Sequence, residues 1–142
     1  TQFSNSIRNN FGFLNRSEDS DPMARDKTFR QEGRKVFKEV VPIAAAHIEG
    51  HLSDLGHAPS AVRRYWLHQA NQGMNQLVIK KLAGDASADL APLILDEFAN
   101  TASAGSIIAF HKHRADLAAG DVGVICSFGA GYSVGSVVLR KR

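Results

Sequence analysis

Apolar residues recur through the first half of the chain at the spacing of an amphipathic helix. Between Thr28 and Gly56 the apolar side chains follow the i, i+3, i+4, i+7 spacing, which places them on one face of an α-helix. Thr28 is suited to cap the amino end of this helix, and Gly56 is suited to stop its carboxyl end. Pro42 lies inside the pattern and predicts a kink, because proline removes one backbone donor. The pattern therefore predicts one long helix over residues 28–56.

Shorter apolar runs follow this helix and alternate with two more helical stretches. The run Val62 to Leu67 is rich in β-forming residues and predicts a strand. Asn71 is suited to cap a second helix that continues to about Leu82. The run Leu93-Ile94-Leu95 predicts another strand, entered through Pro92, which a strand tolerates at its first position. The pattern from Ser103 to about Ala115 predicts a third helix.

The chain closes with two β-rich runs, Val122 to Phe128 and Tyr132 to Leu139. Only three residues separate them, which is short enough only for an antiparallel hairpin. Strands that alternate with helices predict an α/β domain, with helices packed on a layered mixed sheet. We assign this domain to residues 28–142. Residues 1–27 are rich in polar side chains and are interpreted as an irregular segment at an interface or a substrate entrance.

Composition places the chain among ordinary globular proteins. Its 142 residues, 44% of them hydrophobic, suit one domain with a buried core, and no apolar run is long enough to span a membrane. The formal net charge is +3, and the basic residues form short scattered clusters without interleaved aromatic side chains. This pattern argues against a nucleic-acid partner. The clusters are interpreted as solvated faces or, alternatively, as a docking surface for an acidic partner.

The single cysteine and a pair of histidines are the obvious candidates for metal or redox chemistry. One cysteine forms no internal disulfide, which is compatible with the reducing cytoplasm, where we expect the protein to be located. Cys126 lies inside a predicted strand and is interpreted as a buried packing residue. His47 and His51 stand four apart on the long helix, a spacing that can bind zinc. No matching Cys or carboxylate ligands accompany them, so we expect no metal site.

Polar and small residues gather at three junctions where an apolar run ends. His68 follows the predicted strand 62–67, Asn100-Thr101-Ala102-Ser103 precedes the third helix, and the turn Gly129-Ala130-Gly131 joins the two closing strands. In an α/β sheet, the loops at the carboxyl ends of the strands face one common space, where ligands bind. We therefore expect the three junctions to form the wall of a single active site.

The three junctions, taken in order and spacing, resemble a known family. His68-Gln69-Ala70-Asn71, then Asn100 to Ser106 (NTASAGS), then Ser127 to Ser133 (SFGAGYS) look like the C-terminal half of a β-ketoacyl-[acyl-carrier-protein] synthase III. The likeness covers roughly residues 31–142. It implies a thiolase-like fold of two similar α/β halves, normally dimeric, that acts in fatty-acid or related biosynthesis. The implied reaction is a decarboxylative condensation of an acyl primer thioester with malonyl-ACP, and no further cofactor is implied.

The resemblance also implies roles for particular residues. In this family a cysteine nucleophile, a histidine and an asparagine share one pocket, and this chain matches the histidine at His68 and the asparagine at Asn100. A neutral imidazole and an amide can both donate hydrogen bonds to the enolate that decarboxylation leaves. The family's cysteine belongs to the other half of the molecule. We therefore expect an N-terminal half that carries it, either upstream in the same polypeptide or as a separate chain.

Other residues of the junctions are expected to support this pair. The backbone amide of Ala130, between Gly129 and Gly131, is the candidate donor to the tetrahedral oxyanion. Gln69 and Asn71 are expected to surround the site without touching the reacting atoms, Asn71 as a helix cap. Phe128 is expected in the same supporting role.

The sequence departs from the family pattern in ways that bear on its substrates. Gln72-Gly73-Met74 follows Asn71, where close members often carry a basic residue for carrier-protein contact, and Ala99 and Ala130 stand where glycine is usual. A coenzyme A thioester is therefore a candidate primer donor beside the acyl carrier protein. Two alternatives stay open: a non-catalytic half-domain or subunit that completes another chain's site, and a hydroxymethylglutaryl-type or thiolytic relative.

Overall fold

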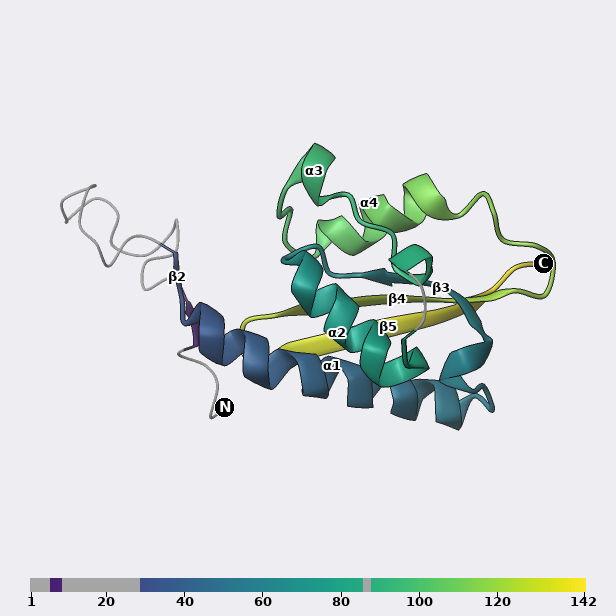
Figure 1. The fold of residues 1–142 in the computed structure, drawn as a ribbon, viewed down its shortest axis with the longest axis horizontal. Coiled ribbons are helices and arrows are strands. Elements are labelled where there is room, and N and C mark those ends of the chain that lie inside the picture. Colours follow the sequence, from purple (N-terminus) through teal and green to yellow (C-terminus); the bar gives the residue numbers. More distant parts are fainter. Residues whose placement is uncertain (1–5, 9–28, 86–87) are drawn as a thin grey trace.

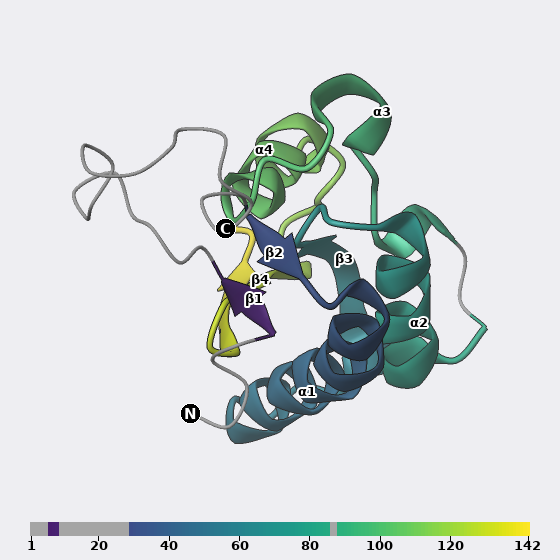
Figure 2. The same ribbon diagram turned by 90° about the vertical axis from the view of Figure 1, so that its left-hand side faces the viewer.

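The computed structural model describes residues 6–8, 29–85 and 88–142. Most of these residues form three layers, a central sheet with helices on both of its faces (Figure 1). The sheet contains β3 (Val62–Leu67), β4 (Val122–Gly129) and β5 (Ser133–Arg140), in that order. In the end-on view, helices α1 and α2 cover one face, and α3 and α4 lie on the other side (Figure 2). The predicted α/β class, with helices packed on a layered sheet, is confirmed.

The sheet is mixed, and its pairing determines which loops meet. Strand β3 runs parallel to β4, with Leu67 opposite Cys126, and β4 runs antiparallel to β5, with Gly129 opposite Ser133. The predicted closing hairpin is therefore confirmed. Because β3 and β4 end at the same edge, the residue after Leu67 emerges beside the last residues of β4.

Helix α1 (Gly33–Asp54) starts later than the apolar pattern predicts. Thr28 lies outside the described residues, and Arg30–Gln31 forms a short strand, β2, that pairs with β1 (Ile7–Arg8). The backbone N–H of Glu32 donates to the carbonyl of Ser6 at 3.0 Å. The prediction that residues 29–32 are helical is wrong, because their backbone pairs with residues that lie far away in sequence.

The other end of α1 and the start of α2 follow the prediction. The helix continues through Pro42 to Asp54, and Gly56 follows with a φ of 73°, a conformation that glycine adopts without steric cost. A 3-10 turn, η2 (Pro59–Ala61), leads into β3. Helix α2 (Gln72–Ala83) begins after Asn71, whose side chain accepts a hydrogen bond from the backbone N–H of Met74 at 3.2 Å. The predicted Asn71 cap is confirmed.

The strand predicted at Leu93-Ile94-Leu95 does not form. After the 3-10 turn η3 (Ala88–Leu90), residues 92–94 belong to no helix or strand, and Leu95 begins the four-residue helix α3 (Leu95–Phe98). The side chain of Gln69 bonds the backbone groups of Pro92 and Ile94 that a neighbouring strand would otherwise use. Helix α4 (Ala104–His113) then follows close to its predicted position.

Two apolar clusters hold the layers together. The larger one joins α1 and α2 to the sheet and includes Cys126, which is 2% exposed, so its predicted packing role is confirmed. The smaller one lies under α4, where Trp66 meets Phe110 edge to face at a ring-centroid distance of 4.9 Å. A Cβ atom at Gly123 would come within 2.4 Å of the Trp66 ring, so glycine is required there. Within the described ranges, no helix is long and apolar enough to cross a bilayer.

Candidate active site

His68 lies directly after β3 and is buried. It is 7% exposed, and its ring contacts that of Phe128 at a centroid distance of 4.3 Å, with the planes tilted by 45°. Burial lowers the pKa of the imidazole below its ordinary value of 6.5, because desolvation disfavours the charged form. His68 is therefore neutral at pH 7 and carries one N–H donor and one acceptor nitrogen.

The Nδ1 atom of His68 has no protein partner among the residues that the structure describes. Buried polar atoms are usually hydrogen-bonded, and the exceptions often lie at functional sites. The side chain is thus held by packing against Phe128 and by the strand that precedes it. Within the described residues its Nδ1 atom is thus left for a ligand or for a group outside this chain.

Asn100 lies in the loop between α3 and α4 and is exposed. Its Oδ1 atom accepts a hydrogen bond from the backbone N–H of Ala102 at 3.0 Å, so the Nδ2 group is the part that can donate to a ligand. Ala99 and Ala102, on either side, have φ angles of 52° and 54°. The loop therefore stores backbone strain, as functional loops often do, and this strained conformation presents the amide.

A pocket of about 450 Å³ joins the first two junctions. Ala70, Asn71 and Asn100 line it on one side. The rest of the lining comes from β2 and from the first turns of α1 and α2: Gln31, Gly33, Arg34, Phe37, Lys38 and Met74. His68 is outside this lining and lies two residues before Ala70. The structure thus brings Asn100 beside the loop that carries His68, but it places the two side chains in different surroundings.

The contribution of α1 to this pocket was not predicted from the sequence. Arg34, Phe37 and Lys38 stand three and four residues apart in the first turns of the helix, so they share one face. That spacing was visible in the sequence, but an exposed amphipathic helix gives the same signal. Only the packing of α1 beside α2 shows that this face borders the Asn71 loop.

Hydrogen bonds join the second junction to the third, and the ring contact of His68 with Phe128 joins the first to the third. The Gln69 side chain bonds the segment that leads to Asn100. Ser127, just before Phe128, donates from its hydroxyl to the carbonyl of Ser103 at 3.2 Å, and the hydroxyls of Ser127 and Ser106 lie 2.7 Å apart. The three junctions therefore lie at one edge of the sheet. Whether they form one catalytic wall stays a prediction.

The third junction has the predicted glycine turn. Strand β4 ends at Gly129, Ala130 is exposed in the turn, and Gly131 has a φ of 130°. Tyr132 at the end of the turn donates from its hydroxyl to Glu39 of α1 at 2.8 Å, which ties the turn to that helix. The role of the Ala130 amide as an oxyanion donor stays a prediction.

The remaining candidates for chemistry take structural positions. Burial raises the pKa of the Cys126 thiol to about 12, so this cysteine is protonated at pH 7 and unsuited to act as a nucleophile. His51 Nδ1 and His47 Nε2 lie 2.7 and 3.0 Å from the hydroxyl oxygen of Ser136 on β5. No group of three metal-binding side chains occurs in the described part of the chain.

Comparison with known proteins gives the family. A family profile described as "3-Oxoacyl-[acyl-carrier-protein (ACP)] synthase III C terminal" matches residues 52–141. The beta-ketodecanoyl-[acyl-carrier-protein] synthase of Pseudomonas aeruginosa is 61% identical over 143 residues, which cover 100% of this chain and 41% of that protein. The beta-ketoacyl-[acyl-carrier-protein] synthase III of Gloeobacter violaceus is 33% identical over 119 residues, 82% of this chain and 36% of that protein.

Solved structures support the fold. The crystal structure of 3-oxoacyl-(acyl carrier protein) synthase III from Pseudomonas aeruginosa PAO1 matches 99% of this chain with a TM-score of 0.78 and 24% identity, and 41% of that chain is covered. The Thermus thermophilus synthase III matches 99% with a TM-score of 0.79 and 21% identity, over 43% of its own length. The chain thus spans about two fifths of the length of these relatives. It belongs to the 3-oxoacyl-[acyl-carrier-protein] synthase III family and matches the C-terminal part of its members.

Proposed function

We propose that this chain provides His68 and Asn100 for the decarboxylative condensation of an acyl primer thioester with malonyl-ACP, in fatty-acid or related biosynthesis. The nucleophilic cysteine is supplied by a half that lies outside these 142 residues. The complete subunits pair as a dimer in the cytoplasm and use acyl-CoA and malonyl-ACP without a further cofactor. The observation that carries the proposal is the buried, neutral His68 next to the loop that borders Asn100.

The reaction begins outside this chain and then uses it. A cysteine thiolate takes the acyl group from the primer thioester and releases the primer's thiol. The malonyl thioester binds next and loses carbon dioxide, so the electrons of the broken carbon–carbon bond form an enolate. The enolate oxygen is negatively charged and needs hydrogen-bond donors in a site that excludes water. An N–H of neutral His68 and the Nδ2 group of Asn100 are the two donors that we assign to it.

Neutrality of His68 is what this role requires. A donor that carries no charge stabilises the enolate oxygen without giving up a proton to it, and burial keeps the imidazole in this form at pH 7. The enolate carbon then attacks the acyl-cysteine, and the cysteine thiolate leaves when the tetrahedral intermediate collapses. We assign the oxyanion of that intermediate to the backbone N–H of Ala130.

The cations beside the pocket suit an anionic thioester. Arg34 and Lys38 line it together with Asn71 and Asn100. Coenzyme A and the prosthetic group of a carrier protein both carry phosphate, which guanidinium and ammonium groups bind well. Close family members often carry a basic residue in the loop after Asn71, and this chain does not. In this proposal, Arg34 and Lys38 of α1 take its place.

A second candidate function follows from the chain's only cysteine. Cys126 is buried and its thiol is protonated, so this chain by itself supplies no thiolate nucleophile. The chain is then a non-catalytic half-domain or subunit that completes the active site of another chain. The two functions differ in whether His68 and Asn100 take part in the reaction.

Exchange of His68 tests the proposal. The assay uses the assembled enzyme, meaning this chain together with the half that carries the cysteine. In His68→Ala, release of carbon dioxide from malonyl-ACP should fall by about 100- to 1000-fold, the usual loss when one such donor is removed. Acyl transfer to the cysteine should stay within a few-fold of the parent rate. Undiminished release of carbon dioxide would refute the role and favour the non-catalytic alternative.

A further inference from the structure

Gln69 is the most completely buried polar side chain beside the candidate site. It is 0% exposed, although it directly follows His68. Its Nε2 group donates to the carbonyl of Leu67 at 3.0 Å and to that of Pro92 at 3.4 Å, and its Oε1 atom accepts from the backbone N–H of Ile94 at 3.1 Å. Both ends of the amide are therefore satisfied, and the bonds join two segments that are 23 to 25 residues apart.

These bonds follow the pattern of a parallel β-ladder. In such a ladder, the N–H and C=O groups of one residue form hydrogen bonds with the residues just before and just after a single position on the neighbouring strand. The Gln69 amide does the same around Leu93, since it donates to Pro92 and accepts from Ile94. One side chain thus takes the place of the strand partner that residues 93–95 lack.

The two segments that Gln69 joins lead directly to the proposed catalytic pair. His68 precedes it by one residue, and Ile94 begins the short arm, through α3, that leads to Asn100. Packing restricts Gln69 further: a Cβ atom at Gly105, in the first turn of α4, would lie 2.7 Å from the Cβ atom of Gln69. Glycine at position 105 thus lets α4 approach the amide closely. Gln69 therefore contacts the chain on both sides of Asn100, at Ile94 before it and at Gly105 after it.

We propose that Gln69 is a positioning residue that sets the placement of Asn100 relative to His68. This inference rests on the proposed function, because it assigns Gln69 a role in the same reaction. A misplacement of about 1 Å between reacting groups can reduce a rate by about 100-fold, so the clamp matters even though Gln69 touches no substrate.

Hydrogen exchange tests the clamp without reference to activity. The assembled enzyme is compared with Gln69→Met, which keeps the length of the side chain but removes its hydrogen bonds. The control is Asn75→Leu, which removes another buried amide, on α2, whose Nδ2 group has no hydrogen-bond partner among the described residues. We expect the backbone N–H of Ile94 to exchange at least tenfold faster in Gln69→Met and to be unchanged in Asn75→Leu. Equal exchange in all three proteins would overturn the clamp.

Kinetics then test the link to the site. In Gln69→Met, the kcat for release of carbon dioxide should fall by about 10- to 100-fold, while acyl transfer to the cysteine and the control variant change little. In Gln69→Glu, the new carboxyl group can donate only while it is protonated. Activity of that variant should therefore recover as the pH falls, a profile that lost packing alone would not produce. Faster exchange at Ile94 with unchanged kcat would overturn the positioning role and leave the proposed function standing.

Discussion

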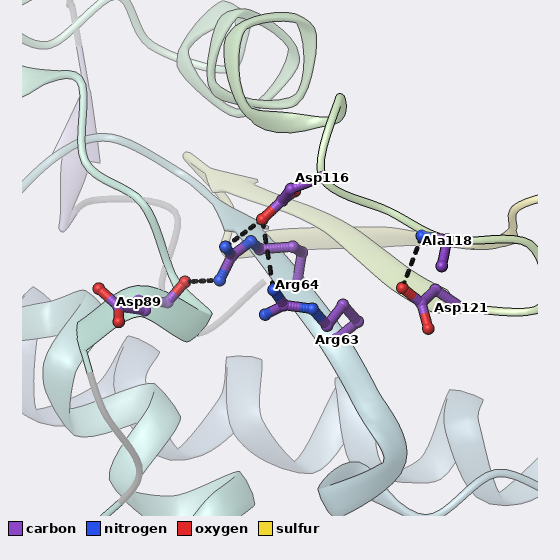
Figure 3. A network of polar contacts seen from close by, with 6 residues as sticks. All are labelled: Arg63, Arg64, Asp89, Asp116, Ala118 and Asp121. Carbon is purple, nitrogen blue, oxygen red and sulfur yellow. Dashed lines mark hydrogen bonds and ion pairs between the residues drawn. The ribbon is translucent and has the colours of Figure 1, made fainter.

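The two ends of the parallel pair β3 and β4 differ in how their polar groups are satisfied. At the amino end, Arg64 ion-pairs with Asp116 and donates to the carbonyl of Asp89, and Arg63 lies 3.5 Å from the same Asp116 carboxylate (Figure 3). At the carboxyl end, His68 is buried with an Nδ1 atom that has no partner in the described residues. Within the described residues each end has a buried nitrogen without a partner, Arg64 Nε at the amino end and His68 Nδ1 at the carboxyl end, but only the amino end is closed by charge pairs.

This difference indicates which end the chemistry occupies. The amino-end contacts join β3 to η3 and to the loop after α4. They therefore fix two segments that lie outside the strands of the sheet. Asp121 on the same side accepts from the backbone N–H of Ala118 at 2.8 Å and closes that loop (Figure 3). We therefore expect substitutions at the amino end to change stability, and substitutions at the carboxyl end to change catalysis.

The largest effect on stability is expected at Gly123, which pairs with Arg64 across the strands. In Gly123→Ala the new methyl group would lie 2.4 Å from the buried Trp66 ring, so either the strand or the ring must move. Overpacking of this kind costs about 1–3 kcal/mol, and we expect the upper end. Urea unfolding of the assembled enzyme measures the loss.

The matched control for Gly123 is Gly135, on the neighbouring strand β5. A Cβ atom at Gly135 meets nothing within 4 Å, so Gly135→Ala should leave the free energy of unfolding within about 0.5 kcal/mol of the parent. Equal losses in the two variants would show that the Trp66 contact does not limit position 123.

A smaller loss is expected for Arg64→Met. The change removes the ion pair with Asp116 and the hydrogen bond to Asp89, and we expect unfolding to become easier by about 1 kcal/mol, because Asp116 is well exposed to solvent. The control is Arg63→Met, whose longer and more exposed contact to the same carboxylate should matter little. A large loss of decarboxylation in Arg64→Met, without a loss of stability, would contradict the division between the two ends.

The contribution of Asp116 should also depend on pH. The hydrogen bond from Arg64 holds the pKa of this carboxyl below its ordinary value of 3.8. Its stabilisation is therefore complete above the ordinary value and is lost as the pH falls through the lowered one. Asp116→Asn should remove this part of the acid dependence, which a comparison of unfolding curves between pH 2 and pH 6 would show.

A gain in stability is expected at the carboxyl end from Ala99→Gly. Ala99 has a φ of 52° and a ψ of −154°, in a region that only glycine adopts without strain. The substitution should raise the free energy of unfolding by up to about 1 kcal/mol, and a freer Asn100 loop should lower the rate of decarboxylation. Ala46→Gly, at an exposed position inside α1, should instead cost about 1 kcal/mol. A loss of stability in Ala99→Gly would argue against strain in this loop.

The smallest effect concerns the charge of His68. Burial lowers its pKa in the folded protein below 6.5, so the unfolded chain binds this proton more readily. Stability should therefore fall as the pH decreases from 6.5 toward the lowered pKa, and level off below it. His68→Gln should remove this component. An imidazole resonance that titrates above pH 6.5 in nuclear magnetic resonance spectra would contradict the neutral His68 on which the mechanism depends.

Much of the fold could be predicted from the sequence because the decisive signals are local. The apolar spacing of α1, the Asn71 cap and the three-residue gap in the closing hairpin each depend on a few neighbouring residues, and all three are confirmed. The start of α1 and the missing strand at 93–95 were predicted wrongly. In both places backbone groups bond to residues distant in the sequence, Ser6 in one case and Gln69 in the other.

The site could be predicted only in part. The motifs identified the three junctions, and the parallel order of β3 and β4 explains why His68 meets Phe128. The pocket beside Asn100, by contrast, depends on where the first turns of α1 pack, which no short motif reports. The burial of Gln69 between two loops is likewise a property of the packed chain rather than of its sequence neighbours.

The central claim is that His68 and Asn100 act together on one developing charge. A double-mutant cycle tests it most directly, by release of carbon dioxide from malonyl-ACP in the assembled enzyme with His68→Ala, Asn100→Ala and both changes. Residues that act as a unit are strongly non-additive, so we predict that the double variant is about as slow as the slower single variant. If the two losses instead multiply, the residues act independently and the shared role is refuted.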